Sequence, residues 1–143
     1  YDRRTVKGGE VMATVTAIST KGGGGGKATL EYICRDDKTD NKKYVTALNC
    51  SLPTVYQEFK NTREMYGKTG GIKYYHFVQS HPSGYEIQPE LAHRIAVEFA
   101  EIAFKGHECV VATHIDAEHI HSHIVFNSVN ADSGRKYHSN ILP

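Results

Sequence analysis

Alternation of apolar and polar residues predicts five β-strands along the chain. Residues 12–19 (MATVTAIS) and 72–80 (IKYYHFVQS) alternate in this way and are rich in the β-branched or aromatic residues that strands favour. Three further strands are predicted over residues 44–50, 108–114 and 120–129. The last two are joined by a connection too short for parallel pairing, so we expect them to form an antiparallel hairpin.

Apolar residues at helical spacing predict three helices between these strands. The clearest helix covers residues 89–105, where Pro89 begins the segment and Gly106 ends it. Its expected buried positions are Leu91, Ile95, Phe99 and Ile102. Shorter helices are predicted over residues 27–36 and from Ser51, as N-cap, to Tyr66. In the helix after Ser51 the expected buried residues are Val55, Phe59 and Met65.

The remaining segments are expected to be loops. Residues 22–26 are consecutive glycines and predict a flexible loop, and residues 36–43 (DDKTDNKK) predict a charged one. Residues 1–11 are polar and lack periodicity, so we expect a disordered leader or a cloning remnant outside the fold. The order β, α, β, α, β, α, β, β predicts an α+β sandwich with helices on one face of a mainly antiparallel sheet.

Length and composition indicate one soluble globular domain. The chain has 143 residues, of which 39% are hydrophobic and 23% charged, as in ordinary soluble proteins. No apolar run approaches the roughly 18 residues of a membrane span, and no signal peptide is visible. Cys34, Cys50 and Cys109 are odd in number and widely spaced, which argues against a disulfide framework or zinc ribbon and favours a reducing cytosol.

Charge is distributed unevenly along the chain. Residues 1–73 carry thirteen Lys and Arg against eight Asp and Glu, whereas residues 74–143 carry four against eight. A basic half could face a polyanion, although ordinary solvated surface explains the imbalance equally well. All nine histidines lie between His76 and His138, and this clustering needs its own explanation.

The most informative histidines lie in the predicted hairpin over residues 113–127. Residues two apart on a strand share a face, so His121 and His123 should point to the same side of the sheet. His114 ends the preceding strand and should fold back beside His121. We therefore expect three imidazoles to converge on an open face of the sheet.

Three neutral imidazoles suit a divalent first-row metal ion and leave coordination positions open for water or substrate. Asp116 could orient one of the ligands through a hydrogen bond, and His119 in the turn is a fourth candidate ligand. An alternative is a set of histidines with no shared role. A histidine-only hydrolase is a further alternative, but the chain has no helical His-Glu-x-x-His.

This hairpin resembles the third motif of mobilisation relaxases of the MobA/MobL and VirD type, in the HUH endonuclease superfamily. Residues 28–37 (ATLEYICRDD) resemble the first motif of these relaxases, in which the catalytic tyrosine lies on a short helix, and that match falls on Tyr32. Residues 75–80 (YHFVQS) resemble the central strand between the two motifs. The resemblance covers about residues 12–139 and implies the two-layer fold of HUH relaxases.

The resemblance also implies a defined reaction. The Tyr32 hydroxyl would attack a phosphodiester at the nick site of a transfer origin, forming a 5′-phosphotyrosyl link and releasing a 3′-hydroxyl. A divalent metal ion would be held by His114, His121 and His123 and would polarise the phosphate. Mn²⁺ or Mg²⁺ is expected, with Zn²⁺, Ni²⁺ or Co²⁺ as substitutes in a crystal.

A tyrosine needs help to become a nucleophile, because its pKa of about 10 keeps it protonated at neutral pH. His76 and Asp116 are the two candidate proton acceptors. Related relaxases often carry a carboxylate where His76 falls, so the identity of the base stays open. The alternative nucleophiles are Tyr44, Tyr74 and Tyr75.

DNA contacts are expected from the basic half of the chain, although simple solvation explains many of its cations. The candidate phosphate contacts are Arg35, Lys38, Lys42, Lys43, Lys60, Arg63, Lys68 and Lys73. The resemblance implies single-stranded origin DNA, accessory nicking proteins and coupling proteins as partners, with no membrane. It also implies a bacterial cytoplasmic protein, exported in some systems with the transferred strand, of which this chain is the N-terminal catalytic part.

Two other functions remain open. A replication initiator or transposase of the same superfamily is less favoured, because those proteins usually place the histidine motif before the tyrosine. The second is a metal-binding module that binds DNA without cleaving it.

Overall fold

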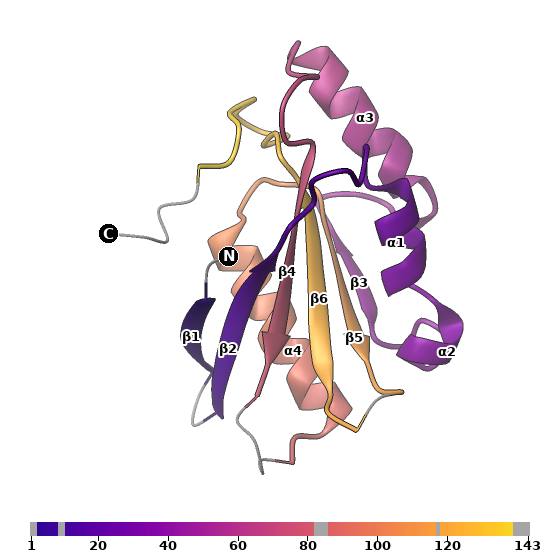
Figure 1. Ribbon diagram of the computed structural model, residues 1–143, viewed down its shortest axis with the longest axis vertical. Helices are drawn as coiled ribbons and strands as arrows, with labels where there is room; N and C mark the ends of the chain where they lie inside the picture. The colour runs from indigo at the N-terminus through magenta and orange to yellow at the C-terminus, as the bar shows by residue number, and fades with distance from the viewer. Residues whose placement is uncertain (1–2, 9–10, 82–85, 117, 139–143) are drawn as a thin grey trace.

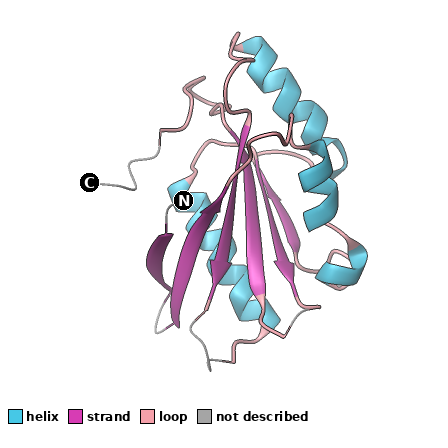
Figure 2. Ribbon diagram, viewed as in Figure 1, coloured by secondary structure: helices cyan, strands magenta, loops and turns pink. Residues whose placement is uncertain are grey.

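The structure, a computed structural model, describes residues 3–8, 11–81, 86–116 and 118–138. One six-stranded sheet has the order β1-β2-β4-β6-β5-β3, and every neighbouring pair is antiparallel (Figures 1 and 2). The strands are β1 (Arg3–Gly8), β2 (Val11–Ile18), β3 (Val45–Leu48), β4 (Tyr74–Ser80), β5 (Cys109–His114) and β6 (His121–Asn127). The helices are α1 (Lys27–Ile33), α2 (Asp36–Thr39), α3 (Val55–Met65), which follows a 3₁₀ turn (Leu52–Thr54), and α4 (Pro89–Ala103). The predicted α+β class with an antiparallel sheet is confirmed.

The predicted hairpin is formed by β5 and β6. Its register places His114 opposite His121 and Ala112 opposite His123. The other neighbour of β6 is β4, whose Val78 also lies opposite His123. The histidine hairpin therefore lies in the interior of the sheet, and β4 brings a third strand beside it.

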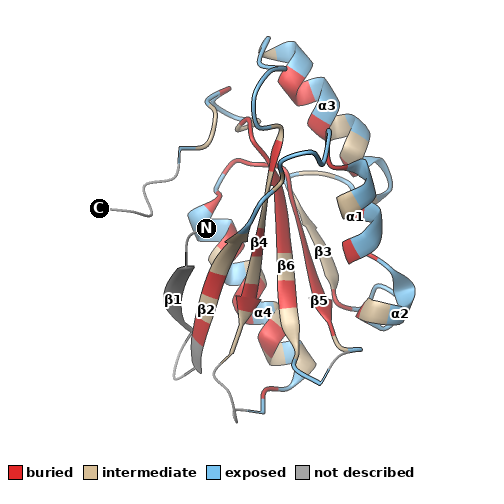
Figure 3. Ribbon diagram, viewed as in Figure 1, coloured by how far each residue is buried: buried red, intermediate tan, exposed pale blue. Residues whose placement is uncertain are grey.

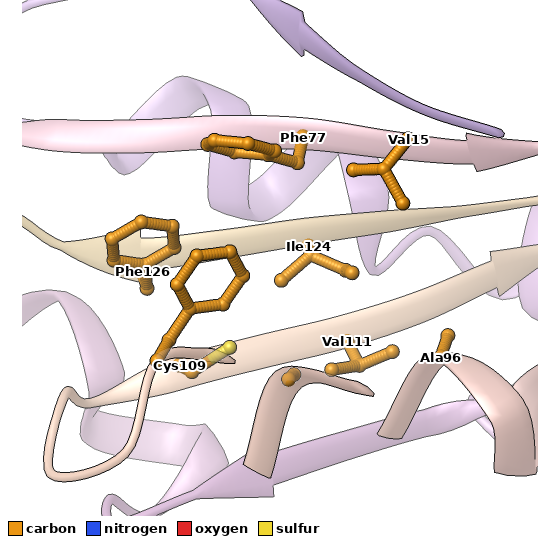
Figure 4. Packing of buried hydrophobic residues seen from close by; sticks show 9 residues of the cluster. Val15, Phe77, Ala96, Cys109, Val111, Ile124 and Phe126 are labelled. Carbon is orange, nitrogen blue, oxygen red and sulfur yellow. The ribbon is translucent and has the colours of Figure 1, made fainter. Parts of the chain in front are cut away.

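Helix α4 covers one face of the sheet, where most of the aromatic core lies (Figure 4). Phe77 of β4 and Phe126 of β6 pack there, and the rings of Phe126 and Phe104 stack with centroids 4.0 Å apart. The helix contributes mainly small residues to this contact, namely Ala96 and Ala100. Ile102, expected to be buried, is 81% exposed, because the alanines occupy the middle of the buried stripe.

Helices α1 and α3 cover the opposite face, so the prediction that helices lie on one face only is wrong. Val110 of β5 and Val125 of β6 pack there with Ile33 of α1 and Phe59 of α3. Strand β5 is buried at every position, and most of β6 is buried too (Figure 3). Strands with apolar side chains on both faces need a covering layer on each.

Three local predictions also differ from the structure. Part of the expected charged loop forms α2, whose end is held by a hydrogen bond from Thr39 Oγ1 to the Arg35 carbonyl, 2.8 Å long. Met65 is 69% exposed rather than buried. Arg3–Gly8, expected outside the fold, pairs with β2 as the edge strand β1. Residues 1–2 and 9–10 of the expected leader lie outside the described residues.

Candidate active site

Helix α1 carries Tyr32 near its C-terminal end, above the sheet face that holds the histidines. Leu30 and Ile33 are buried beneath this helix, so Tyr32 points away from the core and is 46% exposed. His114 donates a hydrogen bond from Nε2 to the backbone carbonyl of Ile33, with 2.9 Å between the two atoms. This bond ties the end of α1 to the end of β5.

Four histidines from three adjacent strands lie on this face. The ring centroids of His114 and His123 are 4.2 Å apart, those of His121 and His123 are 5.8 Å apart, and those of His76 and His123 are 5.0 Å apart. The predicted grouping of three imidazoles on one face is therefore confirmed. The face is not open as expected, because α1 covers part of it.

Among the candidate tyrosines, Tyr32 is the one that reaches this cluster. Its ring centroid lies 5.8 Å from that of His114 and 6.4 Å from that of His123, edge-on in both cases. The other candidate tyrosines have different surroundings. The Tyr44 hydroxyl donates to Glu90, the Tyr74 hydroxyl is hydrogen-bonded to Thr29, and Tyr75 stacks on Phe126 beneath the opposite face.

Two hydrogen bonds determine which ring nitrogens stay available. Since His114 Nε2 carries the proton given to a carbonyl, only its Nδ1 keeps a free lone pair when the ring is neutral. His76 Nε2 and His123 Nδ1 are 2.8 Å apart, so one of these rings donates to the other. If His123 is the donor, its Nε2 is free to bind a metal ion and His76 acts as the acceptor that orients it.

Burial keeps these rings neutral. It lowers the pKa of His123 to about 2 and that of His76 to about 4, and the repulsion that protonated neighbouring histidines would exert adds to both effects. Burial also lowers the pKa of His114. Neutral imidazole is the form that can accept a proton or bind a metal ion.

The three predicted metal ligands fit a divalent first-row ion in kind, because imidazole nitrogen suits such ions. Their nitrogens do not meet at one point, however. Among the residues that the structure describes, no group of three or more His, Cys, Asp or Glu side chains is arranged to hold an ion. His114 shows one reason, since its Nε2 is bonded to Ile33. A shared ion would require rotation of these side chains.

His119, the fourth candidate ligand, lies in the exposed turn between β5 and β6. Within the described part of the chain, no ring contact joins it to His114, His121 or His123. The geometry therefore gives it no place in the cluster.

Lys38 and Asp116 form an ion pair beside Tyr32. Lys38 Nζ is 2.9 Å from Asp116 Oδ2 and 5.2 Å from the centroid of the Tyr32 ring. The hydrogen bond between them raises the pKa of Lys38 and lowers the pKa of Asp116, so both stay charged at neutral pH. From sequence, Lys38 was one of many candidate phosphate contacts, and no signal pointed to this pairing.

The other predicted DNA contacts are less available than expected. Arg35 is paired with Asp37, Lys42 with Asp36, and Lys43 Nζ lies 4.0 Å from Glu90. These pairs partly neutralise the basic half of the chain. Lys73 differs from them, because it lines a small cavity between α3 and the glycine-rich loop.

The sequence matches a known protein family. The sequence model of the family described as "Relaxase: MobA/VirD2-like, nuclease domain" matches residues 32–141, a match that begins at Tyr32. The chain belongs to this relaxase family. The expected family is thus confirmed.

Individual relatives of this relaxase domain agree. A protein named Protein rlx from Staphylococcus aureus is 37% identical over 129 residues, covering 90% of this chain and 36% of that protein. A second Protein rlx from the same species is 41% identical over 95 residues, covering 66% of this chain and 30% of that protein. The group II intron-interrupted relaxase LtrB of Lactococcus lactis subsp. cremoris (strain MG1363) is 35% identical over 140 residues, covering 78% of this chain and 24% of that protein.

The relaxase domain thus spans well under half the length of these curated relatives. No solved structure matches it. Within its described residues, no helix is both long enough and apolar enough to cross a lipid bilayer.

Proposed function

We propose that this domain nicks one DNA strand at a transfer origin and later rejoins it, with Tyr32 as the nucleophile. The observation that carries the proposal is the position of the Tyr32 ring, 5.8 Å and 6.4 Å from His114 and His123 in a relaxase family member. Its partly exposed side chain is open to a large substrate, whereas the alternative tyrosines are engaged elsewhere.

The reaction is a transesterification. Tyr32 Oη forms a bond to phosphorus as the bond from phosphorus to the 3′ oxygen breaks, which yields a 5′-phosphotyrosyl link and a free 3′-hydroxyl. The phenol loses a proton and the departing 3′ oxygen gains one. Rejoining is the reverse attack of the 3′-hydroxyl, because the covalent link conserves the energy of the phosphodiester.

Asp116 is the favoured acceptor of the phenol proton. The alternative acceptor, His76, has its Nε2 engaged with His123, which favours a role in orienting that ring. Lys38 keeps Asp116 ionised and places an ammonium beside the Tyr32 ring, where it can attract a phosphate.

A divalent ion, Mn²⁺ or Mg²⁺, is proposed at His114, His121 and His123, where it would polarise the scissile phosphate. The lowered pKa values of His114 and His123 support this assignment, since a protonated imidazole cannot be a ligand. Single-stranded origin DNA is the proposed substrate, with accessory nicking and coupling proteins as partners in the bacterial cytoplasm.

Covalent capture from a randomised pool tests the proposal and identifies the origin sequence in the same experiment. The protein is incubated with Mn²⁺ and random single-stranded DNA, denatured, and any DNA still attached is recovered and sequenced. We expect enrichment of one sequence by the wild type and by Tyr75→Phe, whose ring stacks on Phe126 on the opposite face of the sheet, but not by Tyr32→Phe. An adduct that survives Tyr32→Phe would move the nucleophile elsewhere. Reversible binding with no adduct would support a non-catalytic DNA-binding module.

A further inference from the structure

A cavity of about 170 Å³ lies at the end of the sheet where both α1 and β4 begin. It is lined by three cationic side chains, Lys60, Arg63 and Lys73, together with Gly25. The loop that contains Gly25 crosses this end of the sheet on its way from β2 to α1 (Figure 1). The cavity exceeds the roughly 30 Å³ of a single water, so it has room for a small anion.

Arg63 is built into the wall of this cavity. It is only 4% exposed, and its Nη1 donates to Asn127 Oδ1 at 3.1 Å and to the Lys73 carbonyl at 3.2 Å. Its Nη2 lies close to Gly25: a Cβ atom added to Gly25 would be 3.2 Å from this nitrogen. The guanidinium is thus held in one orientation, with its second nitrogen facing the cavity.

In the part of the chain that the structure describes, the cations Lys60, Arg63 and Lys73 have no ion-pair partner. Glu64 is the one carboxylate in the cavity lining, so the lining carries net positive charge. Burial lowers the pKa of Arg63, and the attraction of Tyr56, Glu108 and Glu64 does not offset it. An anion bound in the cavity would balance the excess positive charge of its lining.

The other polar groups in the lining suit an oxyanion. Tyr56 and Thr69 line the cavity and add hydroxyl donors to the ammonium and guanidinium groups. The Nη2 donors of the guanidinium, together with flanking hydroxyls and lysines, suit the oxygens of a phosphate group. Gly25 is needed for space, since an added Cβ would lie 3.1 Å from Tyr56 Cε1 as well.

We propose that this cavity, defined by Gly25, Lys60, Arg63 and Lys73, binds a backbone phosphate of the DNA strand that Tyr32 attacks. The inference rests on the proposed function and adds a second anchor point to it. From Gly25 to Tyr32 is about 10 Å along α1 at 1.5 Å per residue, and from Lys73 to His76 is about 10 Å along β4. A phosphate held here therefore belongs to the same strand, a short distance from the nick.

The direct test measures binding of a labelled oligothymidylate at several salt concentrations, in the Tyr32→Phe background so that no adduct forms. For single strands, the slope of log affinity against log salt falls by about 0.7 for each phosphate that the protein no longer neutralises. We expect Lys60→Gln/Lys73→Gln to weaken binding and to reduce this slope accordingly. Gly25→Ala, which keeps every charge but narrows the cavity, should act in the same direction.

Lys105→Gln is the matched control, because it removes one exposed lysine from beyond the end of α4. It should leave affinity and salt slope close to the parent values. Unchanged slopes in both Lys60→Gln/Lys73→Gln and Gly25→Ala would overturn the proposal. Circular dichroism of each variant checks that the fold is retained.

A second arm separates backbone phosphate from free phosphate. A series of oligothymidylates is tested, each with one neutral methylphosphonate linkage at a different position. At one position the neutral linkage should weaken DNA binding by the parent protein but not by Lys60→Gln/Lys73→Gln. Inorganic phosphate is titrated while the amide signals of Gly25 and Lys73 are followed by NMR. Signals that respond to inorganic phosphate, with no sensitive linkage in DNA, would overturn the assignment to DNA. None of these readouts depends on nicking, so they can fail or succeed independently of the covalent capture.

Discussion

His114 and Ile33 join the histidine cluster to the helix that carries the tyrosine. The ring Nε2 of His114 lies 2.9 Å from the carbonyl oxygen of Ile33, and Ile33 directly follows Tyr32. A side chain predicted as a metal ligand is thus also a structural tie. The position of Tyr32 above the sheet depends on that tie as well as on the burial of Leu30 and Ile33.

Loss of this tie should be measurable without metal. We expect His114→Ala to lower the free energy of unfolding by about 1–3 kcal/mol in the presence of a chelator, because it leaves the buried Ile33 carbonyl without its donor. His121→Ala should have a smaller effect, since His121 is only partly buried. Urea unfolding measures both. Equal losses in the two variants would show that the bond from His114 to Ile33 adds no stability.

His76 is expected to support metal binding through His123. His76→Gln should weaken binding of Mn²⁺ by about 10- to 100-fold, as loss of a hydrogen-bond partner of a metal ligand typically does. Competition against a fluorescent chelator measures the affinity. His119→Gln is the matched control and should bind normally, because no ring contact joins His119 to the cluster in the described residues. Weakened Mn²⁺ binding in His119→Gln with normal binding in His76→Gln would contradict this expectation and indicate that His119 is a ligand.

Lys38 is expected to act in the reaction rather than in folding. Lys38→Met should slow covalent adduct formation by about 100-fold, the effect of removing one donor from a developing negative charge. Asp116→Asn should also slow it, and the double variant should lose less than the two effects combined, because the residues are paired. Single-turnover assays with saturating DNA provide the rates. Lys42→Met, which breaks an exposed ion pair with Asp36, serves as the control, and an equal effect there would exclude a special role for Lys38.

The stability of the domain should decrease as the pH is lowered, and one cause is a histidine outside the site. His93 on α4 is hydrogen-bonded to Thr113 at 2.8 Å and Thr46 at 2.7 Å, and burial lowers its pKa below the ordinary 6.5. As the pH falls below the ordinary pKa of histidine, His93 is protonated in the unfolded chain while it stays neutral in the folded protein. The free energy of unfolding therefore decreases as the pH falls through this range. The slope is at most about 1.4 kcal/mol per pH unit for one such histidine.

His93→Gln should make this pH dependence shallower between about pH 7 and about pH 5. Urea unfolding at a series of pH values tests this directly. An NMR titration of His93 at its ordinary pKa in the folded protein would contradict the expectation.

Much of the local structure follows from the sequence. Strand alternation places His121 and His123 on one side of β6, and the short connection from His114 requires a hairpin. The Pro89 helix begins where predicted, and the motif that holds Tyr32 forms a short helix. These features depend on interactions between residues close in the chain, which periodicity records.

Tertiary structure alone decided the rest. The contact between His76 and His123 exists because β4 lies beside β6, and the pairing of Lys38 with Asp116 joins residues 78 positions apart. The positions of α1 and α3 on the second face depend on β5 and β6, which carry apolar side chains on both faces. Such long-range choices follow from how whole faces are buried, so a local pattern identifies the chemical groups but not which of them meet.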